Sequence, residues 1–219
     1  MNIFEKMLSW MPALLRGTGV TISLTALSVS CGLILSLFLA LGKISKSKAV
    51  QKLCGAYIYF FRGTPLLMQL FFIYYALPQL HSALTISSRF TAAWIAYSLN
   101  SAAYLAEIIR AAIQSIDKGQ LEASRALGMS YGKAMRLVII PQSIRRLIPP
   151  IGNEFIMIIK DTSLVSSIAL VDLMKKTSQI QSSTASPLVY LPSMAIYLII
   201  TAALTWGFNR LEKKFSIYE

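Results

Sequence analysis

The sequence predicts an all-α integral membrane protein with about five transmembrane helices in a single domain covering residues 1–219. Of its 219 residues, 55% are hydrophobic and only 14% are charged, a charged fraction that is low for a soluble protein. Several apolar runs approach or exceed the roughly 20 residues that cross a bilayer as a helix. The apolar residues do not alternate every second position, as they would in the strands of a membrane barrel.

The first apolar region has two parts. Apolar side chains between residues 4 and 15 fall on one helical face, which predicts a short helix lying along the membrane surface. The first span is then expected at about residues 17–41. This stretch is rich in Ser, Thr and Gly, and such small residues suit close helix packing in lipid.

The second predicted span, about residues 53–77, is interrupted by the motif "FRGTPLL". The interruption comprises Arg62, Gly63, Thr64 and Pro65. Proline removes a helical hydrogen bond and glycine adds backbone freedom, while the stretch after Pro65 is too short to cross the membrane alone. We therefore expect a broken or bent helix, with Arg62 near the membrane edge or facing protein rather than lipid.

Three further spans are expected at about residues 90–113, 147–170 and 188–208, with a polar segment at 118–141 and a loop at 175–187. Five spans place two connecting segments on the same side of the membrane as the C-terminus: the one between the first and second spans and the one between the third and fourth. Lys and Arg are concentrated in these segments. The richer side should be cytoplasmic, so we expect the N-terminus outside and the C-terminus in the cytoplasm. The same rule accounts for the net charge of +12, and no nucleic-acid partner is expected.

The polar segment "QLEASRALGMSYGKAMRLVIIP" carries apolar residues at helical spacing on both sides of Gly128. Glycine at such a position is typical of a helix that ends in a left-handed turn. The pattern predicts a helix, a tight turn and a second helix, closed by Pro141. A short amphipathic helix of this kind fits a groove in a partner protein. The alternative is a solvated loop that only joins two spans.

Part of this segment, "EASRALGMSYGKAMRLVIIP", resembles the signature loop of ABC importer permeases. Ser124 departs from the alanine of the family, but it is also small. "FRGTPLL" and "NEFIMIIKDTSLV" are similar to segments of the polar amino acid branch. The resemblance implies a MetI-like type I importer permease in a bacterial cytoplasmic membrane. The other signature positions are occupied by Glu122, Ala123, Gly128, Val138, Ile140 and Pro141.

The resemblance also implies partners and a substrate class. Two permease subunits, identical or paralogous, would form the pathway in the lipid, and an extracytoplasmic binding protein would deliver a polar L-amino acid. Glu154 favours cationic or amide types such as arginine, lysine, histidine or glutamine, although its carboxylate could equally serve the α-ammonium group that every amino acid has. Cystine is a further candidate. Two ATPase subunits would use ATP and Mg²⁺, each docked on one signature loop. The chain itself has no phosphate-binding G-x-x-x-x-G-K-[ST] loop, so we expect neither an enzyme nor a bound cofactor.

Ionisable and amide residues within the spans are the candidate substrate ligands, because they are costly in lipid. Asn100, Tyr104 and Glu107 share one helical face, although Glu107 could instead pair with Arg110 three residues later. Asn153 and Glu154 follow the basic residues by about eight positions, which places them roughly 12 Å deep. A carboxylate there could meet an ammonium group. The alternative is a polar contact that holds helices or subunits together.

Three other functions compete with this interpretation. A channel or facilitator that works without ATP would not need a docking segment, and a purely structural permease in a hetero-pair stays open. An intramembrane enzyme would need a nucleophile–base or metal-ligand constellation, and the sequence shows none. Lys160 and Asp161 are expected to form a structural pair or a gate. His81 stands alone, so no metal site is expected.

Overall fold

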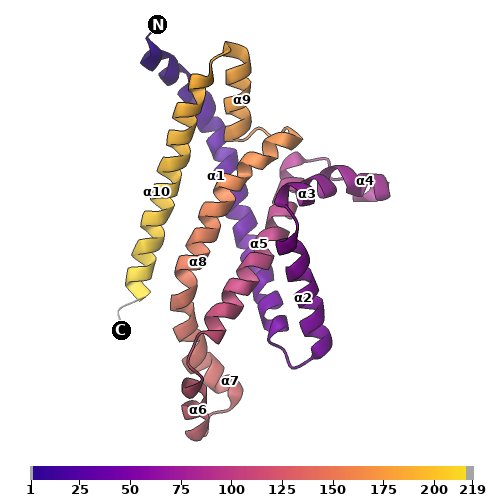
Figure 1. Ribbon diagram of the computed structural model, residues 1–219, viewed down its shortest axis with the longest axis vertical. Helices are drawn as coiled ribbons and strands as arrows, with labels where there is room; N and C mark the ends of the chain where they lie inside the picture. Colours follow the sequence, from indigo (N-terminus) through magenta and orange to yellow (C-terminus); the bar gives the residue numbers. More distant parts are fainter. Residues whose placement is uncertain (1, 216–219) are drawn as a thin grey trace.

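The computed structural model describes residues 2–215, and these are helical with short connections and without strands. Four long helices run along the bundle: α1 (Ile3–Lys43), α5 (Arg89–Gln114), α8 (Ile140–Asp161) and α10 (Tyr190–Phe215). In Figure 1, α6 (Lys118–Ala126) and α7 (Tyr131–Ala134) form one end of the molecule, and α9 (Leu173–Thr184) lies near the other. The all-α prediction is confirmed.

The prediction of a separate surface helix at the N-terminus was wrong. Helix α1 is continuous from Ile3 and contains Pro12. The first turns of α1 are held by packing. Trp10 and Leu14 are buried in a cluster with Leu173 of α9 and with apolar residues of α10. The apolar side of this stretch therefore packs against protein and continues the long helix.

Small residues allow α1 and α5 to approach closely, as the sequence predicted. Buried residues of α1 include two glycines and several Ser and Thr, and those of α5 include seven alanines. A Cβ added to Gly32 would lie 3.2 Å from the backbone nitrogen of Ala102 and from the carbonyl oxygen of Ser98. A larger side chain at Gly32 would therefore push the two backbones apart.

The predicted broken helix is confirmed at the motif "FRGTPLL". Helix α2 (Lys48–Gly63) is followed by Thr64, whose backbone is extended, and α3 (Leu66–Phe71) begins after Pro65. A π-helical turn η1 (Phe72–Ala76) and α4 (Leu77–Leu80) continue α3, and the two halves meet at 104°. A 3₁₀ turn η2 (Ser82–Leu84) leads on to α5.

Pro141 does not close the polar segment, which corrects the sequence prediction. The helix that starts at Tyr131 continues through a π-helical turn, η3 (Met135–Ile139), directly into α8. This π-helical turn lies where the Pro141 ring would clash with a preceding carbonyl in a regular α-helix. The side chains of Gln142 and Ser143 donate to the carbonyls of Val138 and Ile139 at 3.0 and 2.8 Å. The helix therefore passes its proline without a break.

The segment after α8 is more helical than predicted. A 3₁₀ helix η4 (Thr162–Ile168) ends at Ala169, which has a positive φ of 58°, and α9 occupies most of the region expected as a loop. Asp172 caps α9 by accepting from the backbone N–H groups of Met174 and Lys175 at 3.2 and 2.8 Å. Burial of Leu173 and Thr177 explains why this polar sequence is helical. The 3₁₀ turn η5 (Pro187–Val189) precedes α10.

Two helices in the described residues are long and apolar enough to cross a membrane: α1 and the stretch Pro187–Phe215. The bent pair Lys48–Gly63 and Leu66–Leu80 makes a third if it counts as one span. Helices α5 and α8 have 26 and 22 residues, or about 39 and 33 Å at 1.5 Å per residue. The count of five spans and the orientation of the termini stay predictions.

Candidate functional site

A cavity of about 470 Å³ lies at the break between α2 and α3. Its walls come from that break, from α5, and from α8 with the start of η4. We call it the upper cavity. It brings together Asn100, Tyr104, Glu154 and Asp161 with the whole broken-helix motif. The lining residues are Arg62, Gly63, Thr64, Pro65, Leu66, Leu67, Asn100, Tyr104, Glu154, Met157, Ile158, Asp161 and Leu164.

Asn100 is buried at the inner wall of the upper cavity, and it also supports the broken helix. Its Nδ2 donates to the carbonyl of Phe61 at 3.1 Å and to Oε1 of Gln69 at 3.0 Å. A primary amide has two N–H donors, so both are already used. The Oδ1 atom is the part of Asn100 that suits a ligand, as an acceptor for an ammonium or guanidinium group.

Gln69 completes this support and was missed by the sequence reasoning. Its Nε2 donates to the carbonyls of Phe61 and Thr64 at 2.9 and 3.0 Å and to Oγ1 of Thr64 at 2.8 Å. These contacts hold the two halves of the broken helix together. The available signal was a glutamine four residues after Pro65 in an otherwise apolar run.

Two carboxyl groups face the upper cavity from the α8 side. Glu154 is 4% exposed, and Asp161 lies seven residues later, on the same helical face. Arg62 brings a positive charge to the same cavity from the end of α2. A buried carboxylate is stable only with a partner, so this arrangement favours a ligand that carries an ammonium or guanidinium group.

Other predicted site residues lie elsewhere. Asn153 is exposed and does not line the upper cavity. Glu107 lines a second cavity of about 440 Å³, the lower cavity, nearer the end of the bundle with α6 and α7. Among residues 2–215, Lys160 and Asp161 form no ion pair within 4.0 Å, and their pairing or gating stays a prediction. The lower cavity is lined by Lys43, Gly55, Ile58, Tyr59, Arg62, Gly63, Tyr104 and Glu107.

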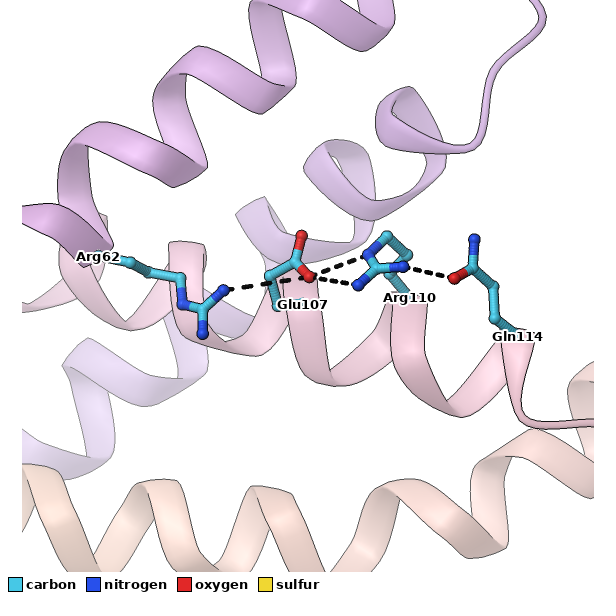
Figure 2. A network of polar contacts seen from close by, with 4 residues as sticks. All are labelled: Arg62, Glu107, Arg110 and Gln114. Atoms are coloured by element: carbon cyan, nitrogen blue, oxygen red, sulfur yellow. Dashed lines mark hydrogen bonds and ion pairs between the residues drawn. The ribbon is translucent and has the colours of Figure 1, made fainter.

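Figure 2 shows the polar network around Glu107. Arg110 donates to Oε2 of Glu107 from Nε at 2.9 Å and from Nη2 at 2.6 Å, and it also donates to Gln114. The pairing of Glu107 with Arg110, which the sequence offered as the alternative to a substrate role, is therefore present. Arg62 contacts protein groups, as expected: its Nη1 lies 4.0 Å from Oε2 of Glu107, and its guanidinium lies 5.3 Å from the ring centroid of Tyr104.

The polar segment folds as the predicted helix, turn and helix. Gly128 has φ of +79°. Its N–H donates to the carbonyl of Arg125 at 2.9 Å, and the N–H of Met129 donates to that of Ser124 at 3.1 Å. These two bonds define a Schellman motif, which favours glycine. Around this turn, Leu127 is 80% exposed, an apolar side chain available to a partner.

The remaining signature positions divide between the surface and the interior. Glu122, Ala123 and Pro141 are exposed, whereas Ser124 is buried. The Ser124 hydroxyl donates to the carbonyl of Gln120 at 2.7 Å, so serine satisfies its polar group within α6. This explains how serine replaces alanine here. The docking role of these residues stays a prediction.

The chain belongs to the family described as binding-protein-dependent transport system inner membrane component, whose pattern matches residues 32–217. It is 39% identical to the arginine transport system permease protein ArtQ of Bacillus subtilis, over 98% of each chain. It is 41% identical to the L-cystine transport system permease protein TcyB of the same organism, over 96% of this chain and 89% of that one. The resemblance to permease subunits of amino acid ABC importers is therefore confirmed.

Solved structures show the same fold. The structure described as an amino acid ABC transporter with histidines superimposes with a TM-score of 0.91 at 40% identity and covers 98% of this chain and 99% of that one. A methionine ABC transporter, MetNI, superimposes with a TM-score of 0.80 at 19% identity, over 94% of this chain and 97% of that one. The second likeness concerns the fold alone, and it confirms the MetI-like architecture.

Proposed function

We propose that this chain is the permease subunit of an ATP-driven importer of polar L-amino acids, with cationic or amide side chains favoured. The amino acid passes through the upper cavity. One observation carries the proposal: a cavity among apolar helices presents the carboxyl groups of Glu154 and Asp161 beside the positive charge of Arg62. A zwitterion with an additional positive charge complements these three groups.

The relatives support the class of substrate. Those named above are described as transporting arginine and L-cystine, and the closely similar structure contains histidines. All three compounds are α-amino acids, so they share an ammonium group and a carboxylate. The two acidic groups in the upper cavity favour arginine, lysine or histidine over an acidic amino acid.

The exposed turn around Gly128 supports coupling to a separate ATPase through residues 120–141. The left-handed glycine places Leu127 outside the bundle, where a groove in a partner can receive it. The complete importer would contain two permease chains, two ATPase subunits that use ATP and Mg²⁺, and an extracytoplasmic binding protein. The second permease is either a copy of this chain or a paralogue.

The proposal is tested by ATP hydrolysis of the complex in liposomes, with the binding protein present and a panel of amino acids added in turn. Stimulation by cationic or amide amino acids is expected. Transport that continues without ATP would support a facilitator instead. Flat hydrolysis from a fully assembled complex would contradict the substrate class.

A further inference from the structure

The upper and lower cavities meet at one wall. Three residues line both cavities: Arg62, Gly63 and Tyr104. Gly63 has no side chain, so the side chains of Arg62 and Tyr104 form the wall. They contact each other, because the Arg62 guanidinium lies 5.3 Å from the ring centroid of Tyr104, within the range of a cation–π interaction.

Arg62 is held more weakly than its partner Glu107. The contact of Arg62 with Glu107 measures 4.0 Å, whereas Arg110 approaches the same carboxylate oxygen to 2.6 Å. Figure 2 shows Arg110 reaching Glu107 along α5, while Arg62 comes from another helix. Glu107 therefore keeps a charged partner on its own helix when Arg62 moves away. The contact of Arg62 can break without leaving a buried, unpaired carboxylate.

The backbone around Arg62 has little freedom, whereas its side chain has more. Gln69 and Asn100 both donate to the carbonyl of Phe61, and Gln69 also holds Thr64. These bonds fix the backbone on both sides of Arg62. The Arg62 side chain is itself 44% exposed. An opening between the two cavities therefore requires a rotation of this side chain and no rearrangement of the broken helix.

We propose that Arg62 is a gating residue that latches α2 to α5 and closes the wall between the upper and lower cavities. Release of Arg62 from Glu107 and Tyr104 joins the two cavities into one path toward the end of the molecule that carries α6 and α7. This inference rests on the proposed function in one respect: it assumes that a substrate in the upper cavity leaves through the lower one.

The test measures how readily a reagent reaches the upper cavity. The assembled importer in liposomes carries Met157→Cys, a lining residue of the upper cavity, with Cys31 and Cys54 changed to alanine. Membrane-impermeant methanethiosulfonate reagents, one cationic and one anionic, are applied from the side of α6 and α7. Arg62→Gln should raise the labelling rate with both reagents by about fivefold, the size expected for losing an exposed ion pair and a cation–π contact.

The two reagents separate opening of the wall from a change in charge. If removal of the positive charge alone mattered, labelling by the cationic reagent would rise and labelling by the anionic reagent would fall, which would overturn the proposal. A second reporter, Tyr59→Cys, lines the lower cavity and is 83% exposed. Its labelling should be the same whether or not the chain also carries Arg62→Gln.

Variants of the network provide matched comparisons. Glu107→Gln should raise labelling of the upper cavity, and Arg62→Lys should restore part of the barrier because it keeps a positive charge. Arg110→Gln should not raise labelling, because it removes a competitor of Arg62 for Glu107. Equal increases in the Arg62→Gln and Arg110→Gln variants would show a general structural effect and overturn the latch.

The readout requires neither a known substrate nor ATP hydrolysis. If no amino acid stimulates the importer but labelling follows the expected order, the proposed function fails and the latch stands. If an amino acid stimulates the importer but Arg62→Gln leaves labelling unchanged, the latch fails and the proposed function stands. Copurification of each variant with the ATPase shows that the complex is assembled.

Discussion

Glu154 is the residue whose charge matters most for the proposed substrate. It is 4% exposed and lines the upper cavity. Glu154→Gln keeps the volume and the acceptor oxygen but removes the charge. We expect uptake by the reconstituted importer to fall about tenfold or more, since a hydrogen bond to a charged group contributes about 1.5–3 kcal/mol, while copurification with the ATPase is preserved.

Asn153→Ala is the matched control for Glu154, because Asn153 is the preceding residue, is exposed, and lies outside the cavity. Its uptake should equal that of the wild type. Unchanged uptake kinetics of Glu154→Gln across the amino acid panel would assign Glu154 a structural role.

Gly128 is a second residue with a specific requirement, since its φ is +79°. A side chain in this conformation costs roughly 1–2 kcal/mol, and a β-branched one is less tolerated still. We expect Gly128→Val to remove the stimulation of ATP hydrolysis while the protein stays in the membrane, and Gly128→Ala to have a milder effect. Gly132→Ala is the control, because Gly132 lies in α7 with no neighbour near an added Cβ. Normal coupling in Gly128→Val would refute the docking assignment.

At the scale of elements, α9 depends on its cap, Asp172, which lies outside the predicted spans and is fully buried. Burial raises the pKa of Asp172 to about 6, and the hydrogen bonds from Lys175 and Met174 only partly oppose this. The unfolded chain has a pKa near 3.9, so the folded state binds the proton more tightly. This contribution to stability is full below pH of about 4 and is lost as the pH rises through about 6.

Asp172→Asn should therefore flatten the change in melting temperature between about pH 4 and 6, because asparagine caps a helix without titrating there. Asp172→Ala should lower the melting temperature at every pH, since losing an N-cap costs about 1 kcal/mol. Thermal unfolding of the purified chain in detergent measures both variants. An unchanged pH profile in Asp172→Asn would show that Asp172 does not titrate in this range.

The elements also show what local sequence can predict. The break after Gly63 was predictable, because Gly63 and Pro65 weaken the helix at the same place. Helix α9 was not predictable, because its polar composition is typical of a loop. It is helical because Leu173 and Thr177 are buried against other helices, and the local sequence does not show this burial. The helix end predicted at Pro141 was wrong for a similar reason. A π-helical turn before Pro141 keeps the helix continuous, and no local sequence pattern predicts that turn.

At the scale of the whole molecule, the site also has some features that local sequence predicts and others that depend on packing. Spacing along one helix correctly placed Asn100 and Tyr104 on a common face of α5, and both line the upper cavity. Spacing did not reveal that Asp161 completes the cavity or that Gln69 supports it. Those relations depend on how α3, α5 and α8 are placed against each other, which is determined by packing over the whole bundle.

The orientation of the whole molecule yields the last prediction. In Figure 1, α6 and α7 lie at the opposite end from α9. The excess of Lys and Arg in the segments around α6, α7 and the α1–α2 connection predicts that this end is cytoplasmic. Two exposed positions report the two ends, Lys133 in α7 and Ser182 in α9.

Each position is changed to cysteine in a chain whose Cys31 and Cys54 are replaced by alanine. A membrane-impermeant thiol reagent is then added to protoplasts or spheroplasts, whose cytoplasmic membrane is intact. Ser182→Cys should react at once, and Lys133→Cys only after the membrane is made permeable. The reverse pattern would place α6 and α7 outside, where no ATPase could reach Gly128, and would contradict both the orientation and the docking assignment. Because labelling of Ser182→Cys and Lys133→Cys needs no transport, it tests the topology independently of substrate and partners.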